Sequence, residues 1–155
     1  MTTLVSLVGE DPVPILLCSR HFTPPRVVLV SAAGMESTER IADRLRHFVS
    51  GSEVQILLVD PYNISGICSS LVNAVRHDDG PIFNLTGGTT PMSIAAYEAA
   101  RARNGRFVYM VTKGSGSDAQ SVLYQYGFHE NQPFRESRRV LATISPGDFL
   151  RASLS

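Results

Sequence analysis

The sequence predicts an α/β fold, with a mostly parallel sheet, helices on both faces of that sheet and an antiparallel addition at the carboxyl end. Two patterns indicate this fold. Runs such as 26–30 are nearly all β-branched or aliphatic, as in strands that are covered on both faces. Segments of helical length join these runs, and such crossovers connect parallel strands with a right-handed turn of the chain.

The first half of the chain contains three predicted strands and three predicted helices. Pro12 and Pro14 follow the first apolar run and end it, because proline removes a hydrogen bond from the strand ladder. In the second helix, Ile41 and Leu45 fall on one face at helical spacing. We expect strands over residues 4–8, 26–30 and 54–59 and helices over residues 15–22, 37–49 and 64–76.

The second half begins with the same pattern and then changes. We expect a fourth strand over residues 81–83, an alanine-rich helix over 91–104 and a fifth strand over 107–111. After these, a loop rich in glycine and serine leads into strand-like segments near residues 122–128 and 139–144, which we expect to be antiparallel. A last short helix, capped by residues 145–148, is expected to end at Leu154.

The whole chain is expected to form one domain, residues 1–155. Its length suffices for one sizeable core, and its 43% hydrophobic and 18% charged residues are typical of a globular protein. Its 14 basic and 14 acidic residues give a formal net charge of +0, so a broad electrostatic grip on duplex nucleic acid is not indicated. A small anion is compatible with this balance of charges.

Cysteine and histidine usage bears on the compartment and on metal sites. Cys18 and Cys68 fall on separate predicted elements without metal-ligand spacing, so we expect two buried free thiols and a cytoplasmic location. No apolar stretch approaches the roughly 20 residues that span a bilayer, so no membrane association is expected. The histidines are scattered, so no metal site is predicted, and no cofactor is indicated.

A glycine-rich turn after the fourth strand is the strongest candidate for a site. It has the sequence Asn84-Leu85-Thr86-Gly87-Gly88-Thr89-Thr90-Pro91-Met92. The Gly87-Gly88 pair lets the backbone turn sharply and approach a ligand closely. Thr89 or Thr90 can cap the following helix, with Pro91 at its first position. Unpaired amides and the positive end of the helix dipole then suit an anion such as phosphate.

The other strand ends belong to the same predicted edge of the sheet, because open parallel sheets bind ligands outside the carboxyl ends of their strands. The five strand-end loops span residues 9–14, 31–38, 60–63, 86–90 and 112–117. Carboxylates in these loops can read ribose hydroxyls or do acid–base work. For Asp60, which precedes Pro61, initiation of the turn is an equal alternative.

Three familiar motifs are not matched. No Gly-Lys-Ser/Thr follows the glycine pair, so the turn is not a Walker A loop and hydrolysis of nucleoside triphosphates is not indicated. Gly114-Ser115-Gly116 lacks the helix that a dinucleotide site needs after it. Ser31 and Ser65 are not set in a Gly-x-Ser-x-Gly elbow, so nothing supports hydrolysis by a serine nucleophile.

The turn also resembles a motif of a known family. Together with Ser93-Ile94-Ala95-Ala96-Tyr97, it resembles the Asn-hydrophobic-Thr-Gly-Gly-Thr-Lys-x-Met-Ser-hydrophobic-Ala-Ala motif of CARF domains, the CRISPR-associated Rossmann fold sensors. The likeness is closest to the branch fused to restriction-type nucleases. The segment 5–10 with Pro12 and Pro14 resembles that branch's opening strand and loop, Thr38-Glu39-Arg40 the start of its first main helix, and Asp148-Phe149-Leu150 its closing helix. The resemblance covers nearly the whole chain and implies a Rossmann-like sheet.

The resemblance implies a homodimer that binds a cyclic oligoadenylate, the second messenger of type III CRISPR immunity, in a two-fold cleft made by the strand-end loops of both subunits. Thr90 stands where the family's motif has lysine, which removes a cation from each half of the site, and Lys113 is the candidate to replace it. The ligand-binding residues expected in this cleft are Gly9, Glu10, Asp11, Pro12, Ser31, Ala32, Thr38, Asp60, Tyr62, Asn63, Thr86, Gly87, Gly88, Thr89, Thr90, Met92 and Lys113.

Three functions are compatible with these observations. The first is a homodimeric sensor that binds cyclic tetra-adenylate, or secondly cyclic hexa-adenylate, and regulates an effector domain absent from this chain, in cis if the chain is an excised portion. The second is a metal-independent ring nuclease that degrades the messenger; no catalytic residue is assigned, and loss of the motif lysine disfavours this function. The third is an unrelated α/β nucleotide-binding protein that shares the turn by chance.

Overall fold

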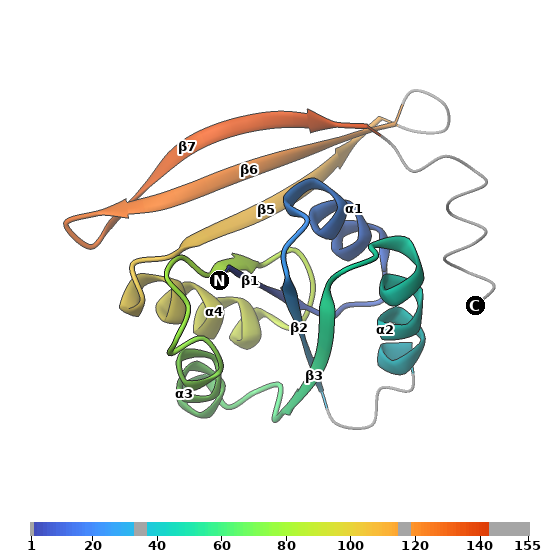
Figure 1. Cartoon of the computed structure of the whole chain (residues 1–155). Coiled ribbons are helices and arrows are strands. Elements are labelled where there is room, and N and C mark those ends of the chain that lie inside the picture. Colours follow the sequence, from blue (N-terminus) through green and yellow to red (C-terminus); the bar gives the residue numbers. More distant parts are fainter. Residues whose placement is uncertain (1, 33–36, 115–118, 143–155) are drawn as a thin grey trace.

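A computed structural model describes residues 2–32, 37–114 and 119–142 of the chain (Figure 1). These residues contain a seven-stranded sheet with the strand order β3-β2-β1-β4-β5-β6-β7. In chain order the elements are β1 (Thr3–Leu7), α1 (Val13–Phe22), β2 (Arg26–Ala32), α2 (Ser37–Phe48), β3 (Glu53–Val59), α3 (Ile64–Ala74), β4 (Ile82–Asn84), α4 (Thr90–Ala102), β5 (Arg106–Lys113), β6 (Gln120–His129) and β7 (Gln132–Leu141).

Strands β1 to β5 are parallel, whereas β6 and β7 add to the sheet in antiparallel fashion. This arrangement confirms the predicted α/β class. β4 lies beside β1 rather than beside β3, so the chain reverses its direction across the sheet after β3. The carboxyl ends of β1 and β4 therefore form a topological switch point, the place where open α/β sheets bind ligands.

Helices cover both faces of the central strands, with α1 and α2 on one face and α3 and α4 on the other (Figure 1). Each strand supplies both cores, because successive side chains point to opposite faces. On β2, Val27 and Leu29 pack against α1 and α2, whereas Val28 and Val30 pack with α3 and α4. Burial on both faces explains why the middle of β2, Val27 to Val30, is continuously apolar.

Helix α4 carries alanines where it faces the sheet. Ala95, Ala96, Ala99 and Ala100 are each 0% exposed and belong to the core beneath the helix. Small side chains let the helix axis approach the strands closely, as the alanine-rich sequence predicted. The first turn of α4 is thereby held at the end of β4, beside the switch point.

The antiparallel addition is longer than predicted. Glu130 and Asn131 join β6 to β7, and their φ values of 50° and 63° fit a type I′ hairpin turn. The prediction placed the last strand at residues 139–144, whereas β7 spans Gln132–Leu141. It was wrong because β7 lies at the edge of the described sheet, and almost all of its residues are exposed, so it has no apolar pattern. Residues 143–144 and the predicted closing helix lie outside the described residues.

Both cysteines are free, but they differ in burial. Cys18 is buried, and this burial raises the pKa of its thiol to about 12. Cys68 was predicted to be buried and is only partly so, because it lies on α3 at the margin of the core. Among the described helices, none has the length and apolar character to cross a membrane. Among all the residues that the structure describes, no group of three His, Cys, Asp or Glu side chains could hold a metal ion.

Candidate functional site

The carboxyl ends of β1 and β4 are in backbone contact at the switch point. A Cβ atom at Gly87 would lie 2.4 Å from the carbonyl oxygen of Leu7 and 2.8 Å from the amide nitrogen of Gly9. A Cβ atom at Gly9 would lie 3.3 Å from the Cα of Gly87. Position 87 therefore admits only glycine unless the backbone shifts. Sequence reasoning assigned the glycine pair to the approach of a ligand, and in the structure Gly87 approaches β1.

Gly88 and Thr89 direct the turn into α4. Gly88 has a φ of 80°, in the left-handed region that glycine adopts readily. Thr89 is the N-cap of α4, because its Oγ1 accepts a hydrogen bond from the amide of Met92 (3.3 Å), and Pro91 stands in the first turn. The same Oγ1 donates to the carbonyl oxygen of Pro61 (2.6 Å) and so ties the turn to the β3–α3 loop. Of the two predicted caps, Thr89 is the one in use.

Thr86 is held by the buried side chain of Asn84, which begins the predicted turn motif but was not among the predicted ligand-binding residues. The amide and the Oγ1 of Thr86 both donate to Oδ1 of Asn84, at 3.1 and 2.7 Å. Thr86 Oγ1 also accepts from the amide of Met110 on β5 (2.9 Å). Both donors of Thr86 are therefore used within the protein. The sequence signal for Asn84 was a polar residue at the end of an apolar strand.

Three backbone amides of the turn, those of Gly87, Gly88 and Thr90, have no acceptor among the described residues. The neighbouring amides are in use, since Thr89 donates to the sulfur of Met92 (3.5 Å). Helix α4 begins at Thr90 and is 13 residues long, so the positive end of its dipole lies at the same place. Unpaired amides at the start of a helix are suited to bind an anion.

The loops after β1 and β3 reach the same edge of the sheet through short turns. Asp11 Oδ1 accepts from the amide of Val13 (3.0 Å) at the start of α1. Asp60 Oδ1 accepts from the amide of Tyr62 (3.1 Å), and Asn63 caps α3. Asp60 thus initiates its turn, which is one of the two alternatives that the sequence left open. Recognition of a ribose by Asp60 stays a prediction.

The predicted ligand-binding residues differ in exposure. Ser31, Thr38 and Met92 are 0%, 2% and 1% exposed. Ser31 Oγ lies 2.6 Å from Thr38 Oγ1, and this hydrogen bond joins the end of β2 to the start of α2, while Met92 packs in the core under the turn. The exposed members of the set are Glu10, Asp11, Asp60, Tyr62, Asn63, Gly88, Thr90 and Lys113, and the half-buried ones are Gly9, Pro12, Ala32, Thr86, Gly87 and Thr89.

Lys113 was expected in the loop after the fifth strand, but it is the last residue of β5. β5 extends beyond its apolar residues because β6 pairs with it as far as Lys113. Lys113 Nζ donates to the hydroxyl of Tyr124 (3.5 Å), and hydrogen bonds from Arg138 and Lys113 lower the pKa of that phenol. Met110 is level with Thr86, so Lys113 lies about 10 Å further along β5 than the turn.

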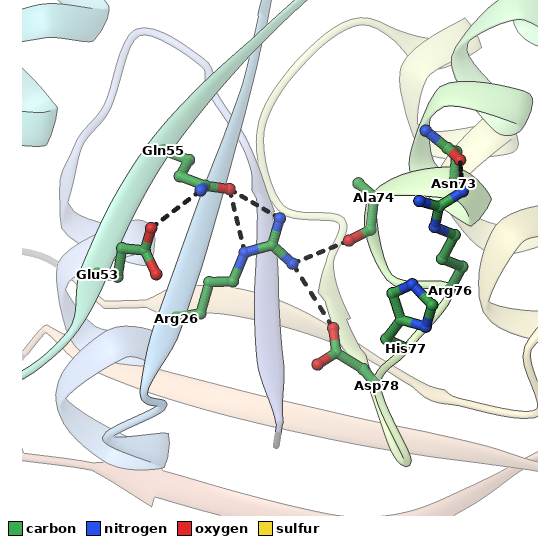
Figure 2. A pocket seen from close by; sticks show the side chains of 8 residues that line it. All are labelled: Arg26, Glu53, Gln55, Asn73, Ala74, Arg76, His77 and Asp78. Atoms are coloured by element: carbon green, nitrogen blue, oxygen red, sulfur yellow. Dashed lines mark hydrogen bonds and ion pairs between the residues drawn. The ribbon is translucent and has the colours of Figure 1, made fainter.

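A concave region lies at the amino ends of the strands (Figure 2). It is a polar pocket of about 490 Å³ between the starts of β2 and β3 and the end of α3. Arg26 donates to Oε1 of Gln55 through Nε and Nη2 (3.0 and 2.7 Å) and to the carbonyl of Ala74 through Nη1 (2.8 Å). Arg26 Nη1 also lies 3.7 Å from Oδ2 of Asp78, which accepts from Thr3 Oγ1 (2.5 Å). Because these groups are paired with one another, we assign this pocket a structural role.

The fold and the site together define a class of protein, an α/β domain of the Rossmann type with a glycine-rich turn at its switch point. Within this class, the family model of the Card1 CARF domain matches residues 3–134. The chain therefore belongs to the Card1 CARF domain family. The resemblance seen in the turn motif is thereby confirmed. No curated protein has a matching sequence.

Several solved structures share the fold. Can2 from Sulfobacillus thermosulfidooxidans, in complex with cyclic tetra-adenylate, is 21% identical with a TM-score of 0.71, over 98% of this chain and 41% of that chain. Csm6 from Enterococcus italicus, bound to cyclic hexa-2′-fluoro-hexa-dAMP, is 19% identical with a TM-score of 0.61, over 72% and 34%. A type III CRISPR defence DNA nuclease activated by cyclic oligoadenylate is 23% identical with a TM-score of 0.67, over 97% and 23%. The chain spans less than half the length of each of these proteins.

Proposed function

We propose that this domain is a sensor that binds a cyclic oligoadenylate in type III CRISPR antiviral signalling, with cyclic tetra-adenylate as the first candidate and cyclic hexa-adenylate as the second. The observation that carries the proposal is the turn with three unpaired amides at the start of α4, in the switch point of a CARF sheet. Phosphates of the ring are the anions that such amides would hold. The ligands of the similarly folded Can2 and Csm6 support this class of messenger.

In this proposal the domain acts as a homodimer. One chain supplies one turn, whereas a ring of four or six adenylates presents the same groups to two chains related by a two-fold axis. Exposed apolar side chains near the carboxyl edge support a protein interface there. Tyr62 is 75% exposed, Ile64 is 39% exposed and Ile94 is 45% exposed, and they lie in or near the first turns of α3 and α4.

In this proposal the domain regulates an effector domain absent from this chain, which lies in the same polypeptide if the chain is an excised portion of a longer protein. This chain covers 41%, 34% and 23% of the three similar structures, which leaves room in each for further domains. The proposed compartment is the cytoplasm, because thiols such as those of Cys18 and Cys68 stay reduced there and the nucleotide messenger acts inside the cell.

Titration calorimetry with cyclic tri-, tetra- and hexa-adenylate tests the proposal. We expect heat with cyclic tetra-adenylate, at a stoichiometry of one ring to two chains. The cyclic trimer is expected to bind more weakly than the tetramer, because a three-fold ring cannot present identical halves to a two-fold cleft. If none of the three rings gives heat, the sensor proposal is wrong.

The same sample separates a sensor from a ring nuclease. After long incubation of cyclic tetra-adenylate with stoichiometric protein, chromatography is expected to recover the intact ring. Cleavage would need stabilisation of the charge that develops on the phosphodiester, and Thr90 offers no cation for this. Linear adenylates in the chromatogram, absent from a control without protein, would assign the domain to the enzymes.

Thr90→Lys is expected to bind cyclic tetra-adenylate about tenfold more tightly than the natural domain, roughly 1.4 kcal/mol. Thr90 is exposed at the first residue of α4, so a lysine there can reach a phosphate without disturbing the core, and a charge-assisted hydrogen bond is the stronger kind. Calorimetry at two salt concentrations measures the gain, which should shrink as salt screens the added charge. Thr90→Gln is the control of similar length without the charge, and an equal gain from glutamine would contradict the electrostatic reason.

A further inference from the structure

Asn84 occupies the last position of β4, in the centre of the sheet. It pairs with Ser6 on β1 and with Val108 on β5, and it is 1% exposed. Its neighbours on β4, Phe83 and Ile82, are both part of the apolar core. A carboxamide in such a place is costly unless its polar atoms are hydrogen-bonded, so the bonds that Asn84 makes account for its presence.

The oxygen end of the Asn84 side chain holds the first residue of the turn. Oδ1 accepts from the amide of Thr86 at 3.1 Å and from its Oγ1 at 2.7 Å. The first of these bonds closes an Asx turn, in which a side chain takes the place of a backbone carbonyl. The hydroxyl of Thr86 in turn accepts from the amide of Met110 at 2.9 Å. Thr86 is thus fixed between β4 and β5, with no donor left over for a ligand.

The nitrogen end of the same side chain contacts β1 and the first turn of α1. Nδ2 lies 3.4 Å from Ser6 Oγ and 3.5 Å from the carbonyl oxygen of Pro14, in the first turn of α1. Ser6 itself is 0% exposed. One side chain therefore connects β1 and the first turn of α1 with the β4–α4 turn at the switch point.

We propose that Asn84 is a positioning residue for the ligand site. By accepting both donors of Thr86, it fixes the peptide that leads into Gly87, and it leaves the amides of Gly87, Gly88 and Thr90 as the donors to the ligand's phosphate. Thr86 positions the turn in this scheme and gives the ligand no hydrogen bond from its own donors. The inference rests on the proposed function, because the phosphate it orients is that of the cyclic oligoadenylate.

Asn84→Ala tests the oxygen end. We expect it to bind cyclic tetra-adenylate at least about 30-fold more weakly than the natural domain, measured by calorimetry on protein that circular dichroism shows to be folded. Thr86→Val should lose affinity for the same reason, and the double variant should lose little more than either single one, because both remove one coupled unit. Asn73→Ala, on α3 at the other edge of the sheet, is the matched control and should bind as the natural domain does.

Asn84→Asp keeps the oxygen and changes only the other end. Aspartate accepts both Thr86 donors as asparagine does, so its ring affinity should stay within about threefold of the natural value, even if the melting temperature falls because a carboxylate now faces the Pro14 carbonyl. Natural affinity in Asn84→Ala, or multiplicative losses in the double variant, would overturn the inference. Equal losses in Asn84→Asp and Asn84→Ala would overturn it too, since they would reflect general destabilisation.

Hydrogen exchange separates failure of this inference from failure of the proposed function. In the absence of any ring, the Thr86 amide should be protected in the natural domain and in Asn84→Asp and should exchange at least tenfold faster in Asn84→Ala, because that amide has lost its acceptor. This result holds whether or not a ring binds. Unchanged exchange of the Thr86 amide in Asn84→Ala would show that Asn84 does not fix the turn, whereas lack of binding by the natural domain would reject the messenger alone.

Discussion

Gly87→Ala is expected to weaken binding of cyclic tetra-adenylate by at least about 100-fold, roughly 2.7 kcal/mol. The added methyl group would lie 2.4 Å from the carbonyl oxygen of Leu7 and 2.8 Å from the amide nitrogen of Gly9. Both are backbone atoms of β1 and its loop, so neither can rotate away as a flexible side chain would. The turn must move off β1, and the three unpaired amides move with it.

Calorimetry on Gly87→Ala measures this loss, and thermal unfolding of the same sample shows how much stability is lost with it. Gly80→Ala is the matched control, because a Cβ atom there meets nothing within 4 Å. Gly88→Ala should fall between the two: its φ of 80° strains any other residue, but its nearest contact is the flexible end of Met92. Natural affinity in Gly87→Ala would mean that the contact between β1 and the turn does not set the site.

Asp78→Ala is expected to lower the free energy of unfolding by about 3 kcal/mol and to leave ring affinity unchanged. Asp78 is 6% exposed, accepts from Thr3 Oγ1 (2.5 Å) and lies 3.7 Å from Nη1 of Arg26. Removing the Asp78 carboxylate takes the acceptor from the buried Thr3 hydroxyl and the counter-charge from the largely buried Arg26 guanidinium. This loss lowers the free energy of unfolding more than the loss of an exposed ion pair does. The network lies at the amino ends of β1 and β2, whereas the turn follows the carboxyl end of β4.

Urea denaturation followed by circular dichroism measures this effect, and an unchanged slope with denaturant shows that the folded and unfolded states are otherwise alike. Asp43→Ala removes an exposed ion pair with Arg46, whose two side chains are 57% and 46% exposed, and should cost less than about 0.5 kcal/mol. Asp78→Ala would contradict the structural role of the pocket at the amino ends of the strands in either of two cases. The first is a loss of unfolding free energy as small as that of Asp43→Ala, and the second is a loss of ring binding with no change in stability.

The central fold could be predicted because buried segments have recognisable patterns of apolar residues in the sequence. The centre of a strand such as β2, Val27 to Val30, is covered on both faces and apolar at every position, and the helices between the strands show the spacing of one buried face. The same logic fails for β7, where the hairpin partner supplies the hydrogen bonds and solvent reaches both faces. Phe134 is 46% exposed and Val140 is 53% exposed, and of the apolar residues of β7 it is Leu141, at its end, that joins a core cluster.

The site could be predicted only where its chemistry is local. The cap by Thr89 and the turn at Gly88 are decided by neighbours in the chain, and the sequence indicated both. The contact of Gly87 with Leu7 and the hydrogen bond of Asn84 to Ser6 join residues far apart in the chain, 78 positions in the second case. Such contacts follow from the position of β4 beside β1, and residue spacing in the sequence does not predict them.

The hydroxyl of Thr89 also limits how this position can change in evolution. One oxygen accepts from the amide of Met92 and donates to the carbonyl of Pro61. Aspartate is as good an N-cap as threonine, but an ionised carboxylate has no proton to donate and would face the Pro61 carbonyl. Serine keeps both bonds through one atom. Replacing Thr89 by aspartate would keep the helix cap but lose the hydrogen bond to the β3–α3 loop. Only serine or threonine can therefore occupy this position wherever the turn has to be hydrogen-bonded to that loop.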